Sequence, residues 1–483
     1  MKQLPLPQNW TVTAVGDTSM VPADLIDRVI PATVPGCVHT DLLAAGLIPD
    51  PYIADHEHQV QWIGQTDWRY SGTFELTGRD LAQPMIELAC DGLDTVATLE
   101  LNGQEIGRTQ NMHMRHRFAA KAALREGKNQ LTITFASALH HAEAMRERLG
   151  ELPVDGAGSN PQLPHNFIRK MACNMGWDWG PCLITAGIWR DLRLEAWGTV
   201  RLADVRPVTR SIDSGTGTLD VHVDLERARG GDVIVQAALS GHGYSSQTSQ
   251  NVRGDGFAEP ITFDVPDAAL WWPVGHGEQP LYDLTVWIED EGGQTLEKRS
   301  HRVGLRTSEI ATEPDSPHPD HDLPGHVEGT LPGTSMTLKI NGKPIYCKGA
   351  NWIPDDCFPS RITKDRLRQR ITQARDANMN MLRIWGGGMY ESHDFYDLCD
   401  ELGMLVWQDF LMACAAYAEQ EPMLTLIEDE ARDNVARLPR HPSLVMWCGN
   451  NENLWAYDTW GYQGKRWRDF IGERGWGPRY YFV

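Results

Sequence analysis

The segment Leu444-Val-Met-Trp-Cys-Gly-Asn-Asn-Glu-Asn453 decides the fold of the C-terminal part of this chain. It begins as a short apolar run and ends in consecutive polar residues, which is typical of a buried strand that ends at a site. Two similar apolar runs precede it, at Met381–Trp385 and Met404–Trp407. The segments between and before these runs have helical patterns, at Arg361–Asn378, Glu391–Leu402 and Leu426–Leu438. Strands that alternate with helices in this way form a parallel sheet.

This alternation predicts the first half of a (β/α)8 TIM barrel. A run at Ile345–Ala350, entered through an Asn341-Gly342 turn, supplies one more strand, so four βα units follow one another. A closed barrel needs about 250 residues, and the segment from Ile340 to Val483 is little more than half as long. We therefore expect residues 336–483 to hold only the first half of a barrel domain.

Two all-β domains are expected before the barrel. Short alternating segments within residues 1–197 predict a first β-sandwich, and Asn102-Gly103 is a tight-turn signal between two of them. A second series within residues 198–310 predicts an immunoglobulin-like β-sandwich. Residues 311–335 are rich in Pro, Gly, Asp and His without periodicity. We interpret them as a solvated acidic loop rather than as a metal clip.

The composition excludes several classes of partner. The formal net charge is -21, from 65 acidic and 44 basic residues, and no Lys/Arg-rich block is present to follow a phosphate backbone, so nucleic acid is not expected. The nine cysteines lack CxxC spacing, which favours a reducing compartment. The stretch Met1–Pro7 lacks the apolar core of a signal peptide, and no later run is long enough to cross a bilayer. We expect a cytoplasmic protein without membrane partners.

Glu452 is the strongest candidate for a catalytic acid. In a parallel barrel the active site lies at the carboxyl ends of the strands, where polar residues follow each of the four predicted strands, at 351–356, 383–388, 408–409 and 449–453. Glu452 lies beside two amides and between Trp447 and Trp455, and apolar walls favour the protonated acid that glycosidic cleavage requires. The alternative is a purely structural carboxylate.

Several motifs resemble a known enzyme family. Asn450-Asn451-Glu452 resembles the acid/base signature of the large clan of retaining glycosidases, and Leu270–Tyr282 with Val303–Thr307 resemble landmarks of glycoside hydrolase family two. The β-mannosidases of that family are singled out by three motifs, all present here: Gly176-Trp-Asp-Trp-Gly-Pro181, Arg383-Ile-Trp-Gly-Gly-Gly388 and Trp447-Cys-Gly-Asn-Asn-Glu-Asn453. The resemblance extends from about Val34 to the end of the chain and implies that the first sandwich is a jelly-roll sugar-binding domain.

The resemblance also implies roles for individual residues. It makes Glu452 the acid/base and places Asn451 against the sugar O2, with Trp385 as a wall of the subsite. Trp177 and Asp178 would reach in from the first domain, and Arg383 would lie beneath the nucleophile. Taken alone, Trp385 is equally consistent with simple packing, and an Asp between two tryptophans, as at Asp178, is more often a turn residue. Arg383, a cation within an apolar strand, needs a partner in any case.

The implied activity is that of an exo-acting retaining glycosidase. It would release terminal non-reducing β-D-mannose from β-mannosides and manno-oligosaccharides by double displacement, without metal or organic cofactor. The nucleophile would be a glutamate that ends strand seven, beyond Val483, so the 483-residue chain is expected to be inactive. We do not expect Asp178, Asp355, Asp356 or Asp409 to replace it. The alternatives are another activity of the family, such as β-galactosidase or β-glucuronidase, and a non-hydrolytic carbohydrate-binding fragment.

Overall fold

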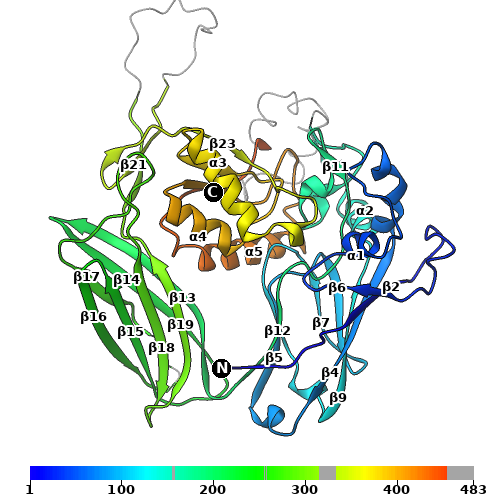
Figure 1. The fold of residues 1–483 in the computed structure, drawn as a ribbon, viewed down its shortest axis with the longest axis horizontal. Helices are drawn as coiled ribbons and strands as arrows, with labels where there is room; N and C mark the ends of the chain where they lie inside the picture. Colours follow the sequence, from blue (N-terminus) through cyan, green and yellow to red (C-terminus); the bar gives the residue numbers. More distant parts are fainter. Residues whose placement is uncertain (155–157, 255, 257, 315–332, 454–483) are drawn as a thin grey trace, which may run out of the picture.

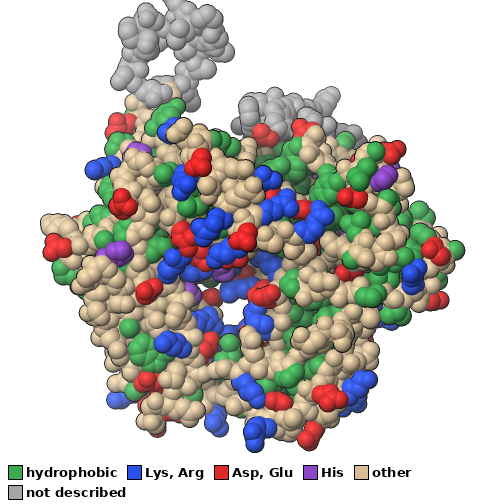
Figure 2. Space-filling view, viewed as in Figure 1, with side chains coloured by type: hydrophobic (Ala, Val, Ile, Leu, Met, Phe, Trp, Pro, Cys, Tyr) green, Lys and Arg blue, Asp and Glu red, His purple; other side chains and the backbone are tan. Residues whose placement is uncertain are grey.

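The computed structural model describes residues 1–154, 158–254, 256, 258–314 and 333–453. They form two β-sandwiches and a parallel α/β unit, each with a core of its own. The first sandwich, in blue to cyan, and the second, in green, both contact the α/β unit, in yellow to orange (Figure 1). An opening remains between the three units, and Lys and Arg side chains gather at its edge (Figure 2). These units confirm the predicted fold class.

The first sandwich packs a six-stranded sheet, in the order β3-β2-β4-β9-β6-β7, on a four-stranded sheet, in the order β1-β12-β5-β8. Alternate residues of β4 are buried, including Trp68 and Tyr70, as the period of two requires. Asn102 and Gly103 both have positive φ and close the β6–β7 hairpin, as predicted. The strands are β1 (Lys2–Leu4), β2 (Trp10–Val15), β3 (Ile30–Ala32), β4 (Asp67–Leu76), β5 (Met85–Cys90), β6 (Val96–Leu101), β7 (Gln104–Gln110), β8 (His116–Ala119), β9 (Gly127–Phe135) and β12 (Leu192–Trp197).

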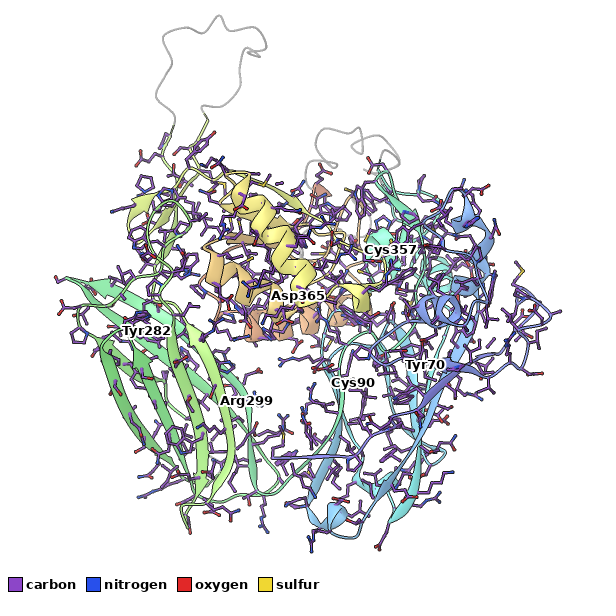
Figure 3. All side chains as sticks on the ribbon, in the orientation of Figure 1. Tyr70, Cys90, Tyr282, Arg299, Cys357 and Asp365 are labelled. Atoms are coloured by element: carbon purple, nitrogen blue, oxygen red, sulfur yellow. The ribbon has the colours of Figure 1, made fainter. Side chains whose placement is uncertain are left out.

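Helices and one hairpin extend this sandwich. The buried Tyr70 hydroxyl (Figure 3) donates to Asp41 of α1 over 2.9 Å, which fixes the helix on the sheet. The hairpin β10–β11 carries Trp177 at its tip. These elements are α1 (Val38–Ala44), α2 (Ala138–Leu149), the hairpin strands β10 (Met175–Trp177) and β11 (Gly180–Cys182), and the 3-10 helices η1 (His56–Gln65), η2 (Asp80–Ala82), η3 (Lys121–Ala123), η4 (His165–Phe167) and η5 (Ala172–Asn174).

The second sandwich consists of two sheets that pack face to face. One has three strands, in the order β13-β14-β17, and the other has four, in the order β16-β15-β18-β19. Alternate residues of β15 and β18 are buried between the sheets. Arg299 of β19 (Figure 3) donates to the Ala203 carbonyl of β13 over 3.0 Å and ties the sheets together. The strands are β13 (Val200–Asp213), β14 (Thr216–Arg227), β15 (Val233–Gly241), β16 (Tyr244–Val252), β17 (Ile261–Val265), β18 (Tyr282–Asp290) and β19 (Thr295–Val303).

The α/β unit is a half-barrel of four parallel strands in the order β23-β24-β25-β26. The Thr363 hydroxyl caps α3 by accepting from the Arg366 N–H, and Gly403 ends α4 in the left-handed conformation. The elements are β23 (Gly349–Trp352), η6 (Pro359–Arg361), α3 (Lys364–Asp376), β24 (Met381–Ile384), α4 (His393–Leu402), β25 (Leu405–Asp409), α5 (Met423–Arg437) and β26 (Leu444–Cys448).

The prediction for the first barrel strand was wrong by several residues. Ile345 does not begin the strand, because its N–H bonds to the Leu338 carbonyl over 2.8 Å and its side chain packs beside Leu338 and Ile340. It therefore belongs to the small antiparallel sheet of β20 (Ser308–Ala311), β21 (Thr337–Ile340) and β22 (Lys343–Pro344). The parallel strand begins only at Gly349.

Ion pairs and one hydrogen bond join the three units. Arg115 of the first sandwich bonds to Asp433 of α5 over 2.8 Å and lies 3.4 Å from Asp204 of β13. A second pair, Arg169 with Glu430 of α5, is buried at 1% and 2% exposure of the side chains. Cys357 (Figure 3) donates its N–H to the Tyr52 hydroxyl over 2.9 Å, where a barrel loop meets the first sandwich. These contacts hold α5 and the loop after β23 against the first domain.

No helix in the described ranges is long and apolar enough to span a bilayer.

Candidate active site

Arg383 connects the carboxyl ends of all four barrel strands. Its Nε and Nη2 donate to the two carboxylate oxygens of Asp409 over 3.1 and 2.7 Å. Its Nη1 donates to Asn351 Oδ1 over 3.2 Å, and Nη2 also donates to Asn451 Oδ1 over 2.9 Å. The predicted need of this cation for a partner is confirmed. Asn351 lies in β23, Asp409 is the last residue of β25, and Asn451 follows β26.

Asp409 is fully buried beneath this network. Burial raises the pKa of its carboxyl to about 6, although the Arg383 guanidinium opposes that shift. Its Oδ2 also accepts the N–H of Gly386 over 3.0 Å. A side chain at Gly386 would meet the Met412 carbonyl at 2.7 Å, which explains why the first residue of the triple glycine is required. Asp409 therefore anchors Arg383 and the glycine loop together.

Glu452 lies four residues after the end of β26 and is half-buried. Its Oε2 accepts from Asn451 Nδ2 over 3.2 Å and from the Cys414 thiol over 3.2 Å. The Asn451 N–H donates to the Met412 carbonyl over 2.8 Å, which aligns this turn with the loop after β25. The structure therefore brings Glu452, Asn451 and Arg383 together at one end of the sheet.

Three tryptophans from two domains meet beside this end of the sheet. The Trp385 ring, 6% exposed, lies 4.7 Å from the Trp177 ring and 5.7 Å from the Trp179 ring, both edge-on at 77°. Gly387 must lack a side chain, because a Cβ there would lie 1.9 Å from the Trp385 ring. Asp178, between the two hairpin tryptophans, is exposed, and its N–H bonds to the Gly158 carbonyl over 2.7 Å. The hairpin reaches the barrel as expected, with Asp178 at its edge.

A polar segment of the first domain, which the sequence patterns did not reveal, supports the loop after β25. His165 Nε2 lies 3.3 Å from the Ala413 carbonyl, and Asn166 Nδ2 donates to the Ala416 carbonyl over 2.6 Å. His165 also contacts the Trp177 ring at 5.6 Å. The only available signal was a set of polar residues in an otherwise apolar stretch, because their partners lie about 250 residues later.

Other carboxylates near the strand ends are already bound. Asp355 pairs with Arg366 and Arg370, and Asp356 pairs with Arg361 and Arg366. These contacts direct both carboxylates toward α3. Trp447, which was expected beside Glu452, stacks on Phe410 at 5.0 Å. Trp455 and most of the acidic 311–335 loop, residues 315–332, lie outside the described residues.

One grouping in the described part of the chain has the residue types of a metal site: Asp397, Asp400 and His441. His441 Nδ1 bonds to Asp400 Oδ2 over 2.7 Å, and Asp400 Oδ1 accepts the N–H of Ser443 over 2.9 Å. Arg440 lies 3.4 Å from Asp397. These contacts explain the grouping as a hydrogen-bonded anchor between α4 and β26.

Glu391, at the end of the glycine loop, makes stability depend on pH. It is 2% exposed, and its Oε1 accepts from Trp352 Nε1 over 3.0 Å. Burial raises its pKa from 4.5 to about 7. Because the folded state then holds this proton more tightly than the unfolded state, stability is lost as pH rises from about 4.5 through 7.

We expect Glu391→Gln to remove that loss, since the amide oxygen still accepts from Trp352. Above pH 7 the variant should be more stable than the parent by about 1–3 kcal/mol, with a smaller difference at pH 5. Urea unfolding at both pH values measures this. Glu309→Gln, at a side chain that is 61% exposed, is the control. The same pH dependence in the Glu391→Gln variant and the parent would contradict the expectation.

Three family descriptions match successive parts of the sequence. The glycosyl hydrolase 2 galactose-binding domain-like family matches residues 10–190, glycosyl hydrolases family 2 matches residues 200–306, and the TIM barrel domain of glycosyl hydrolases family 2 matches residues 334–470.

Similar proteins agree with these matches. A β-mannosidase of Capra hircus is 37% identical over 450 residues, which cover 89% of this chain and 49% of that protein. β-Mannosidase B of Thermothelomyces thermophilus is 38% identical over 469 residues, 95% of this chain and 51% of that protein. The crystal structure of a β-D-mannosidase from Dictyoglomus thermophilum is 35% identical, with a TM-score of 0.85 over 98% of this chain and 56% of that one. The chain spans about half the length of the curated relatives it matches.

Proposed function

Because this chain belongs to glycoside hydrolase family 2, we propose that its complete gene product is an exo-acting retaining β-mannosidase. Its substrates would be β-mannosides and manno-oligosaccharides, from which it releases the terminal non-reducing mannose. Relatives named β-mannosidase support this proposal. The observation that carries it is the position of Asn451 and Glu452 at the carboxyl end of β26, bound to the same network as Arg383.

In the proposed mechanism Glu452 donates a proton to the glycosidic oxygen and later activates water as a base. Retaining catalysis needs a second carboxylate about 5–5.5 Å away, which attacks the anomeric carbon. Among the described residues, Asp355, Asp356 and Asp409 at the other strand ends are each held by arginine. We therefore propose that the nucleophile is a glutamate outside the described residues.

Asn451 and the tryptophan cluster would hold the terminal sugar. Arg383 fixes Asn451 through Oδ1 and so orients the amide, and we assign to this amide the contact with the sugar O2. Trp385 with Trp177 offers apolar ring surface of the kind that packs against a sugar face. The hairpin from the first domain would close this side of the site, which suits removal of one terminal unit at a time.

We also propose that the protein works in the cytoplasm and that neither nucleic acid nor membrane is its partner. The nine cysteines are all free thiols, as in a reducing compartment. The net charge of -21 disfavours binding to phosphate backbones.

The proposal is tested by comparing the kcat/KM values of the complete gene product on 4-nitrophenyl glycosides. We expect the β-mannoside to exceed the β-glucoside, β-galactoside and β-glucuronide by tenfold or more, because the O2 configuration is read by a buried polar group. A higher kcat/KM for the galactoside or the glucuronide than for the mannoside would contradict the β-mannosidase assignment. The protein would then have another activity of the family. Binding of mannose without turnover of any of these substrates would favour a carbohydrate-binding role instead.

A further inference from the structure

The thiol of Cys414 lies against the candidate acid. Its Sγ is 3.2 Å from Glu452 Oε2 and also accepts from Asn451 Nδ2 over 3.2 Å. Cys414 is 5% exposed and follows β25, 38 residues before Glu452 in the sequence. In the described part of the chain, both hydrogen bonds of the Glu452 carboxylate fall on Oε2.

The backbone around this contact is held in an uncommon conformation. Cys414 has φ of 51° and Glu452 has φ of 63°, both left-handed without being glycine. Such residues persist only where neighbouring contacts determine them, and they concentrate at functional sites. Here the Cys414 N–H donates to the Asn451 carbonyl over 3.0 Å, and the Asn451 N–H donates to the Met412 carbonyl over 2.8 Å. The two turns therefore position each other.

We propose that Cys414 is a positioning residue for the acid/base Glu452, an inference that rests on the proposed function. The thiol donates its proton to Oε2 while its sulfur accepts from Asn451, so a continuous set of donors runs from Arg383 through Asn451 and Cys414 to Glu452. This arrangement leaves Oε1 to face the leaving-group oxygen.

The chemical effect arises when Glu452 gives up its proton. The carboxyl becomes a carboxylate as the glycosidic bond breaks, and a fixed donor stabilises that developing charge without reorganisation. A thiol is a weak donor, so the effect is that of one modest hydrogen bond to a charged group. Only reactions that need the proton benefit from it.

The test compares kcat/KM of the complete gene product for mannobiose, whose leaving group needs protonation, and for 2,4-dinitrophenyl β-mannoside, whose leaving group does not. We expect Cys414→Ala to lower the mannobiose value about tenfold and the dinitrophenyl value less than twofold. Cys414→Ser, which restores a donor, should recover most of the mannobiose activity. Cys414→Gly also removes the thiol, at a position whose φ favours glycine. This variant takes the place of Cys414→Ala in the test if Cys414→Ala does not fold.

Two further variants separate the possible failures. Cys448→Ala removes a thiol of β26 that donates to the Asn450 carbonyl over 3.2 Å. This variant should change the kcat/KM values for the two substrates by the same factor or leave both unchanged. Glu452→Gln reports on the proposed function itself through the same pair of substrates. If Glu452→Gln discriminates between them while the Cys414 variants lower both values equally, the positioning role is overturned and the proposed function stands. If Glu452→Gln does not discriminate, the proposed function fails first.

Discussion

In the complete gene product, Glu452→Gln is expected to lower kcat/KM for mannobiose by about 10²–10⁴-fold and to leave 2,4-dinitrophenyl β-mannoside nearly unchanged. General acid catalysis contributes in that range, and only a poor leaving group needs the proton. Glutamine keeps the oxygen that accepts from Asn451 and Cys414, so the geometry of the turn is retained. Steady-state kinetics on both substrates measure the difference.

A matched control is Glu401→Gln, which changes an acid in α4 whose partners are Arg302 and Arg368. That variant should have the parent's rates on both substrates. An equal loss on mannobiose and the dinitrophenyl glycoside in the Glu452 variant would remove Glu452 from the acid role. It would then be a structural carboxylate of the turn after β26.

The half-barrel was predictable because its pattern is local. Apolar runs of four or five residues ended in polar clusters, and three of the four strands formed where these runs predicted them, at β24, β25 and β26. The first strand was misplaced because Ile345 is as apolar as a barrel residue, while its actual partner, Leu338, belongs to a different sheet. Periodicity identifies a buried strand without saying which sheet buries it.

The site was predictable only in part, for a related reason. Glu452, Asn451 and Arg383 belong to motifs that the sequence displays directly, and their convergence follows from the parallel sheet. Cys414 and His165 carry no such signal, because their contacts depend on the path of the loop after β25 and on the docking of the first domain. Contacts that depend on domain docking have no local pattern that a sequence can display.

The buried pair of Arg169 and Glu430 is expected to stabilise that docking strongly. Arg169 Nη2 lies 2.7 Å from Glu430 Oε1, and Asn111 also donates to Glu430 Oε2 over 3.0 Å. Burial alone would raise the pKa of Glu430, but Arg169 outweighs it and the net shift is downward. We expect Arg169→Met to cost about 3–5 kcal/mol at pH 7, because it leaves a buried carboxylate without its counter-charge. Urea unfolding followed by tryptophan fluorescence measures the loss.

Two comparisons separate this effect from simple loss of packing. Without Arg169, burial dominates and the pKa of Glu430 rises in the folded state, so protonation at pH 5 should recover part of the stability that is lost at pH 7. Adding Glu430→Gln to Arg169→Met should recover part of it at pH 7 as well, since no charge is then buried. Arg432→Met, in the exposed pair with Glu428 on the same helix, should change nothing measurable. If the Arg169 variant is equally destabilised at both pH values and the double variant recovers nothing, then packing rather than charge holds α5 against the first domain.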